Sequence, residues 1–236
     1  MRFFIITLFP ESFVSYFETS IIGRAIKEKK IKITYVNPRD FVTGKFKRVW
    51  PDGNVSRIVD DRPFGGGPGM VMRAEPILKA VEKIQKQLAK KKDVKIKIIN
   101  FVPSAKKFDT AYAKQAAKKY TDIILICGRY EGIDARVGKI LKAEELSIGD
   151  YVLTGGELPA MVVIDTIARQ VEGVLGNFDS REEERVSSSE VYTRPEVLVY
   201  PLSSKTPARQ RKYKVPPVLL SGNHKDIEEW KQSQKK

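Results

Sequence analysis

Residues Asp122–Asp134 read Asp-Ile-Ile-Leu-Ile-Cys-Gly-Arg-Tyr-Glu-Gly-Ile-Asp, and they say more about the fold than any other part of the chain. The apolar run Ile123–Cys127 has the length and the β-branched content of a buried strand. Glycine follows at once, at Gly128, where a residue without a side chain allows a tight turn and a close approach to a ligand. This segment therefore predicts a buried strand with a candidate binding loop at its carboxyl end.

The rest of the chain predicts strands and helices that alternate around this strand. Further strands are predicted at Arg2–Leu8, Ile31–Asn37 and Lys95–Val102, and a short apolar segment follows at Gly149–Leu153. Apolar residues at helical spacing predict helices at Glu11–Lys30, Ala74–Lys91, Thr110–Lys119, Asp134–Leu141 and Glu157–Val171. Such alternation, with nearly continuous apolar strands, is typical of an α/β fold with a mostly parallel sheet flanked by helices.

The charge of the chain favours a polyanionic partner. Its 236 residues hold 43 Lys and Arg against 29 Asp and Glu, a formal net charge of +14. Surface lysines that serve only solubility are the alternative, but some cations are interleaved with aromatic residues, a pattern that can hold phosphates and stack bases. One such cluster lies in Ser203–Lys214 around Tyr213, and another joins Lys45, Lys47 and Arg48 to Phe46 and Trp50.

Several classes of protein are excluded by residue counts. A single cysteine, Cys127, allows no internal disulfide, and a single histidine, His224, excludes zinc sites built from Cys and His clusters. The longest apolar runs have five residues, far short of a bilayer span. The apolar start of the chain is interrupted by Pro10 and Glu11, unlike a signal peptide. We therefore expect a cytoplasmic protein with no membrane segment.

Three glycine-rich segments mark candidate binding loops, at Phe64–Met70, Cys127–Asp134 and Ser147–Pro159. Turn formation alone is the alternative explanation for each of them. Neither of the two common phosphate-binding glycine motifs is present. Loops at the carboxyl ends of parallel strands are nevertheless where such folds bind ligands.

These segments together make the chain recognisable. It resembles the bacterial tRNA (guanine-N1)-methyltransferase family of the knotted SPOUT class, in blocks that follow the same order along the chain: Leu8–Pro10, Pro38–Phe41, Val59–Met70, Cys127–Asp134, Ser147–Ala160, Gly173–Gly176, Tyr192–Val197 and Val215–His224. The resemblance implies a deep trefoil knot, S-adenosylmethionine as methyl donor, and methylation of guanosine 37 of tRNA where a guanosine precedes it. It also implies a homodimer with its active site at the subunit interface.

The same resemblance implies a division of the chain and a donor site. Residues 1–172 would form the knotted donor-binding catalytic domain, 173–194 a flexible linker, and 195–236 a small, truncated, helical tRNA-binding domain. The donor would contact Phe101, Val102, Pro103, Gly128, Tyr130, Glu131, Ile148, Gly149, Asp150, Tyr151, Val152, Leu153, Gly155, Gly156 and Pro159. For Ile148 and Leu153, burial in the core is an equally natural reason to be apolar.

Substrate contacts are implied at two places. Asp60, Asp61, Gly65, Gly66, Gly67 and Gly69 resemble the family segment that reads the target guanosine and its 5′ neighbour, although a capped turn explains them as well. In the C-terminal cluster, we expect Arg209, Arg211 and Lys212 to contact tRNA phosphates.

Methylation of guanine N1 needs a general base, because this nitrogen carries a proton at neutral pH. The family arginine that assists the reaction maps to Arg169, for which an i,i+4 pair with Asp165 is the structural alternative. The family aspartate base falls on Glu184 when counted from Gly176, and near Ser180 when counted back from Tyr192. Asp179, Glu182 and Glu183 remain rivals for that role. No protein metal site is implied, although Mg²⁺ could assist.

The chain departs from the family pattern in ways that keep a second function open. Phe101–Ala105 replaces Leu-Ser-Pro-x-Gly, insertions occur at Val49–Arg57 and Val199–Tyr213, and the usual helical extension after Trp230 is short. The alternative is a knotted RNA-binding or assembly protein with little or no catalysis.

Overall fold

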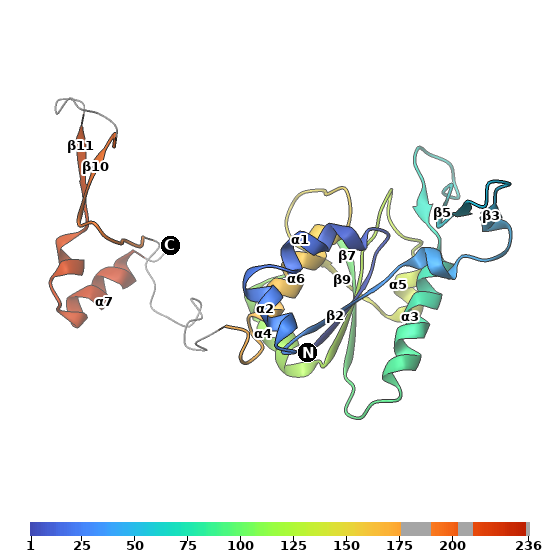
Figure 1. The fold of residues 1–236 in the computed structure, drawn as a ribbon, viewed down its shortest axis with the longest axis horizontal. Helices are drawn as coiled ribbons and strands as arrows, with labels where there is room; N and C mark the ends of the chain where they lie inside the picture. The colour runs from blue at the N-terminus through green and yellow to red at the C-terminus, as the bar shows by residue number, and fades with distance from the viewer. Residues whose placement is uncertain (176–189, 203–209, 235–236) are drawn as a thin grey trace. The chain divides into compact units, whose positions relative to one another are not determined.

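A five-stranded parallel sheet organises the N-terminal part of the chain, with the strand order β2-β1-β8-β7-β9 (Figure 1). Its strands are β1 (Arg2–Ile6), β2 (Lys32–Val36), β7 (Ile96–Lys107), β8 (Asp122–Ile126) and β9 (Glu144–Ser147). Strand β8 lies at the centre and all five of its residues are buried. The predicted α/β fold with a central parallel sheet is confirmed.

This computed structural model describes the whole chain except residues 176–189, 203–209 and 235–236. Two units are distinguished, Met1–Gly176 and Asn177–Lys236. Within the described residues, no helix is both long enough and apolar enough to span a bilayer.

Helices cover both faces of the sheet because the side chains of β8 alternate between two apolar cores. Ile123 and Leu125 pack with η1 (Pro10–Phe13), α1 (Val14–Phe17), α2 (Ser20–Lys27), α4 (Thr110–Lys119) and α6 (Glu157–Ala168). Ile124 and Ile126 pack on the opposite side, with α3 (Ala74–Leu88), α5 (Arg136–Leu141) and the segment around η2 (Pro38–Phe41). The sheet is therefore buried on both faces, as a continuous apolar strand requires.

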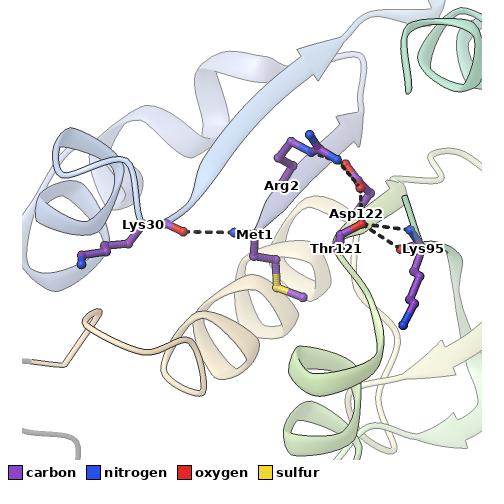
Figure 2. Close-up of polar contacts among 6 residues, drawn as sticks. All are labelled: Met1, Arg2, Lys30, Lys95, Thr121 and Asp122. Atoms are coloured by element: carbon purple, nitrogen blue, oxygen red, sulfur yellow. Dashed lines mark hydrogen bonds and ion pairs between the residues drawn. The ribbon is translucent and has the colours of Figure 1, made fainter. Parts of the chain in front are cut away.

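One ion pair aligns the amino ends of three neighbouring strands (Figure 2). Arg2 on β1 donates two hydrogen bonds to the carboxylate of Asp122 on β8, at 2.5 and 2.6 Å. Thr121 donates to the same carboxylate and accepts from the amide of Lys95, next to β7. Asp122 has no exposed surface, so its charge depends on these partners.

The segment Glu11–Lys30 is not the single continuous helix that was predicted. The segment forms η1, α1 and α2 in succession, and it breaks at Thr19–Ser20, where Ser20 adopts a left-handed φ of +53°. The break lets α2 fold back on α1. A Cβ on Gly23 would lie 2.6 Å from the carbonyl carbon of Glu18, so the turn requires glycine there.

One strand prediction also needs correction, because β7 runs past Val102 to Lys107. The apolar segment Gly149–Leu153 is a loop, and the fifth strand, β9, forms earlier at Glu144–Ser147. The register of β7 on β9 shifts between Phe101 and Lys106, both of which pair with Leu146. The residues between them bulge out of the ladder, and a bulge can accept Pro103, which has no amide hydrogen.

Two small antiparallel pairs follow η3 (Gly44–Phe46) in the first unit. Strands β3 (Lys47–Val49) and β4 (Val55–Arg57) form one pair, and β5 (Asp60–Asp61) and β6 (Val71–Met72) form the other.

The prediction of a helical C-terminal region is wrong in part, because a hairpin precedes the helices there. Strands β10 (Val197–Tyr200) and β11 (Arg211–Lys214) pair antiparallel, ahead of η7 (Pro217–Leu220) and α7 (His224–Ser233). The β-branched and aromatic residues of β10 favour a strand. Asn223 caps α7 by accepting a hydrogen bond from the amide of Lys225.

We expect Arg2→Ala to destabilise the first unit strongly, because it leaves the buried Asp122 carboxylate without its cation. Loss of one partner of a buried pair costs about 3–5 kcal/mol. Urea denaturation followed by circular dichroism measures the free energy of unfolding. Lys79→Ala is the control, since it removes an exposed ion pair with Glu75 worth at most ~0.5 kcal/mol. Equal stability of the two variants would contradict the role of this ion pair.

Candidate active site

A cavity of about 420 Å³ opens between the bulge of β7 and the loops at the carboxyl ends of β8 and β9. Three segments supply its walls: the bulge of β7, the loop after β8 and the loop between β9 and α6. The lining residues are Asn100–Pro103, Gly128–Ala135, Gly138, Glu145–Gly149, Tyr151–Gly156 and Pro159. This is the edge of a parallel sheet at which α/β proteins bind their ligands.

Every predicted donor-binding residue lines this cavity except Asp150. The side chain of Asp150 is exposed and forms an ion pair with Lys107 at 2.5 Å. Several other lining residues were not predicted as donor contacts, among them Asn100, Arg129, Asp134, Glu145 and Thr154. Arg129, Asp134 and Thr154 lie within the predicted binding loops, whereas Asn100 and Glu145, on adjacent paired strands, carried no signal in the sequence.

Backbone contact at Gly156 brings two of the loops together. Its amide donates to the carbonyl of Gly128 at 3.0 Å. A Cβ at this position would lie 2.6 Å from the Cα of Cys127 and 3.0 Å from the amide nitrogen of Gly128. The start of α6 therefore reaches the end of β8 only because residue 156 has no side chain.

A buried ionic group lies next to this contact. Glu157 is 4% exposed, accepts a hydrogen bond from the Thr7 hydroxyl at 2.8 Å, and forms an ion pair with Arg129 at 3.0 Å. The Arg129 Nε–H is not aligned on the carboxylate oxygen, so this contact is ionic rather than a directed hydrogen bond. The guanidinium also lies over the ring of Phe9, 4.6 Å from its centroid. These contacts link the end of β1 to the two cavity loops.

The titratable groups near the cavity limit its chemistry. Burial raises the pKa of the Cys127 thiol well above its usual value, with Glu157 adding to the rise. A thiol in that state is a poor nucleophile at neutral pH. A hydrogen bond from Arg136 lowers the pKa of Asp134, so this carboxylate is ionised at neutral pH. Within the described residues, no cluster of His, Cys, Asp and Glu could hold a metal ion.

The cavity wall holds a buried side-chain acceptor that no described residue satisfies. Asn100 Oδ1 is buried without a hydrogen-bond partner among the described residues, in the cavity wall. Tyr130 holds a left-handed φ of +61°, which is unusual for an aromatic residue. An orphan acceptor and a strained loop fit a polar ligand with N–H groups.

The predicted substrate segment borders the cavity. Asp60 and Asp61 form β5, and Gly65, Gly66 and Gly67 lie in an exposed loop with left-handed φ angles. Gly69 lies against Glu131, because a Cβ there would come within 2.6 Å of the Glu131 side chain. The amide of Glu131 donates to the carbonyl of Met70, and Met72 donates to Gly132. The segment is thus hydrogen-bonded to the loop that follows β8.

Arg169 lies at a second, smaller cavity of about 200 Å³, at the end of α6. Tyr16, Asp165 and Leu175 are among the residues that line it. Asp165, the alternative partner of Arg169, accepts a hydrogen bond from the Tyr16 hydroxyl. This bond raises the pKa of Tyr16 to about 12.

The remaining predicted residues belong to the second unit. Arg211 and Lys212 are exposed on β11. Glu184 and Arg209 lie outside the described residues, as do the rivals Asp179, Glu182 and Glu183.

Comparison with known proteins places the chain in a family. A family model described as tRNA (Guanine-1)-methyltransferase TrmD matches residues 1–236. This chain belongs to that family.

Similar proteins are found in several bacteria. A tRNA (guanine-N(1)-)-methyltransferase of Carboxydothermus hydrogenoformans is 43% identical, over 99% of this chain and 82% of its own length. The protein of the same name from Clostridioides difficile is also 43% identical, over 99% of this chain and 92% of its own. The protein of that name from Pelotomaculum thermopropionicum is 44% identical, over 99% of this chain and 84% of its own length. Family membership thus covers both units of the chain.

We expect Gly156→Ala to reduce stability, because its Cβ would meet main-chain atoms of Cys127 and Gly128, just after β8, that cannot move aside. Overpacking of this kind costs about 1–3 kcal/mol. Gly138→Ala is the matched control: its Cβ meets nothing closer than 3.8 Å, and alanine favours the helix α5 that contains it. Unfolding in urea compares the two variants. A Gly156→Ala protein as stable as Gly138→Ala would show that the contact is not tight.

Proposed function

We propose that this chain transfers a methyl group from S-adenosylmethionine to N1 of guanosine 37 of tRNA, next to the anticodon, in tRNAs with a guanosine before it. The observation that carries the proposal is the cavity, in which the glycine-rich loops of the family come together at the carboxyl ends of three strands. Its volume of about 420 Å³ lies in the range of small-molecule cofactor sites.

The donor site would be formed largely by main-chain groups. The loops Gly128–Glu131 and Ile148–Leu153 present peptide N–H and C=O groups between apolar walls, an environment that suits an adenine ring. The orphan acceptor Asn100 Oδ1 would receive a hydrogen bond from the ligand. When bound, S-adenosylmethionine supplies an activated methyl group on a sulfonium, so no covalent enzyme intermediate is needed.

Two side chains would handle the proton and the charge of the target guanine. Glu184 would remove the N1 proton as general base. Negative charge then spreads toward O6, and the guanidinium of Arg169 would stabilise it there. Asp60, Asp61 and the glycines at 65–67 and 69 would position the guanosine and its 5′ neighbour. Met70 and Met72, which follow these glycines, are hydrogen-bonded to the loop after β8, and β5 pairs with β6, which supports this placement beside the donor cavity.

A trefoil knot would explain how the cavity loops are held. The loops after β8 and β9 touch through Gly156, and passage of one through the other would make that contact permanent. We include this knot in the proposal as the family's fold.

A homodimer with the active site between subunits is also part of the proposal. Helix α6 is buried on one side, yet Leu158 and Val162 are 56% and 43% exposed on another, in line with Asp165 and Arg169 at helical spacing. Tyr16 and Ile21 add exposed apolar surface from the neighbouring segment. A second copy that covers this face would bring its own linker to Arg169.

The remaining features complete the proposal. Residues 173–194 would act as the linker that carries the base, and 195–236 as the tRNA-binding domain, with Arg209, Arg211 and Lys212 on phosphates. The reaction would take place in the cytoplasm, and Mg²⁺ could assist it. A non-catalytic RNA-binding role is not favoured, since the relatives named as enzymes are 42–44% identical over nearly the whole chain.

Single-turnover methylation of an unmodified tRNA transcript with radiolabelled donor tests this function. We expect the wild-type protein to methylate a transcript with guanosines at positions 36 and 37, and Glu184→Gln to be slower by about 10²- to 10⁴-fold, as when a positioned base is lost. Donor affinity, measured by calorimetry, should stay unchanged. Asp179→Asn is the matched comparison. Loss of activity in Asp179→Asn but not in Glu184→Gln would move the base to Asp179.

Mixed subunits test the shared active site. Gly155→Val disables the donor loop, because its side chain would meet Arg129 and Glu157 within 2.6 Å, and Glu184→Gln disables the linker. If each site takes its donor loop from one subunit and its linker from the other, random mixing of the two inactive proteins restores about a quarter of wild-type activity. No restoration, or a monomer in light scattering at micromolar concentration, would contradict the shared site.

A further inference from the structure

The hairpin β3–β4 belongs to the first unit, and its side chains are almost all exposed to solvent. All its strand residues except Ser56 are exposed, and Val49, Trp50 and Val55 keep 67%, 51% and 44% of their surface in solvent. An isolated two-stranded hairpin is marginally stable in water. Apolar side chains on such an element call for a partner.

The base of the hairpin is held firmly, so its tip has a defined position. The amide of Ile58 donates to the carbonyl of Phe46. The guanidinium of Arg73 lies 3.3 Å from the centroid of the Phe46 ring and donates to the carbonyl of Ile58. At the tip, Trp50–Gly53 forms a turn closed by a hydrogen bond from the Gly53 amide to the Trp50 carbonyl, and Gly53 has a φ of +84°.

The charge of this element identifies the kind of partner. Lys45–Arg57 holds the cations Lys45, Lys47, Arg48 and Arg57 and a single carboxylate, Asp52. Arg57 is paired with Asp40 at 3.8 Å, whereas Lys47 and Arg48 form no ion pair with any residue that the structure describes. An exposed tryptophan among free cations is suited to a nucleic acid, whose bases stack and whose phosphates attract. Strands of three residues are too short to bury the ~800 Å² per partner of a stable protein interface.

The hairpin is joined to the active site by a continuous path of main-chain contacts. The amide of Arg73, next to β6, donates to the carbonyl of Val59, at the start of the β5 segment. Strand β6 forms bridges to Tyr130 and Ile133 in the cavity loop. The three residues of β3, at ~3.3 Å each, place Trp50 about 10 Å beyond the anchored end of the hairpin at Phe46. Nucleotides next to the one that enters the cavity would therefore pass near Trp50.

We propose that the β3–β4 hairpin is an RNA-binding arm, in which Trp50 stacks on a base of the tRNA loop and Lys47 and Arg48 contact its phosphates. The inference extends the proposed function, on which it rests, by assigning a substrate contact to an element outside the donor cavity. It predicts a contribution to tRNA affinity and none to binding of the methyl donor.

The experiment measures affinity for an unmodified tRNA transcript by filter binding, without donor, over a range of salt. The Lys47→Ala/Arg48→Ala protein should bind more weakly, with a slope of log K against log salt that is smaller by roughly 0.7–0.9 for each lost phosphate contact. Lys90→Ala/Lys91→Ala, which removes the same charge from exposed positions after the far end of α3, should leave the slope unchanged. Equal slopes for the two double variants would overturn the phosphate contacts.

Trp50 is tested through its ring. Trp50→Ala should weaken binding between about 5-fold and about 150-fold, the range found for loss of one stacked base, and Trp50→Phe should recover most of the affinity. Bound tRNA should quench tryptophan emission in the wild type and quench it less in Trp50→Phe, which retains only Trp230. Unchanged affinity and quenching would overturn the stacking role. A second result would also overturn it: Trp50→Ala could change the oligomeric mass measured by light scattering while RNA binding stays unaltered. The hairpin would then be an interface between copies of the chain.

These readouts separate the arm from the proposed function. If the wild type binds tRNA but does not methylate it, the proposed function fails while the affinities still test the arm. If the wild type methylates and the hairpin variants bind tRNA equally well, the arm alone is refuted.

Discussion

The backbone contact between Gly156 and Cys127–Gly128 is the constraint on which the rest of the structure depends. Strand β8 ends and α6 begins within van der Waals distance, with no side chain between them. This closeness orders the loops on either side of it, one running to Asp134 and the other arriving from Ser147. A cavity walled by peptide groups is the consequence, because both loops must turn within a few residues.

The charges around that contact explain why the cavity keeps a single shape. Glu157 is buried one residue into α6 and is held by Thr7 and Arg129, which come from different segments of the chain. A buried carboxylate is costly without its partners, so rearrangement of one loop would expose an unpaired charge. The same logic applies at the opposite edge of the sheet, where Asp122 depends on Arg2. Ionic contacts thus fix both ends of the strands, while apolar packing fills the middle.

Much of this architecture could be predicted from the sequence, for reasons that particular residues make clear. The β-branched residues of Ile123–Cys127 favour a buried strand, and the glycines that follow it indicate a loop. The break at Ser20 was missed because no glycine or proline marks it; the cause is the packing of Gly23 on Glu18, a contact within the folded turn. The double pairing of Leu146 with β7 was equally hidden, since a bulge depends on the neighbouring strand. The C-terminal hairpin was missed because its two strands are ten residues apart in the sequence, longer than a tight hairpin turn.

The candidate site divides in the same way. Residues in contiguous glycine-rich blocks were recognised, whereas Asn100 and Glu145 enter the cavity only because β7 and β9 are neighbours in the sheet. Asp150 was grouped with the loop that contains it, yet its side chain turns toward Lys107. A sequence block identifies a loop, and side-chain direction within that loop needs the fold.

The burial of Cys127 has a consequence for the chemistry of oxidation. A thiol that has no solvent contact and little thiolate is inert toward peroxide and toward disulfide exchange. Because this is the chain's only cysteine, neither a sulfenic acid nor a mixed disulfide can form readily while the protein is folded. The end of β8, next to the cavity, is therefore insensitive to cysteine oxidation.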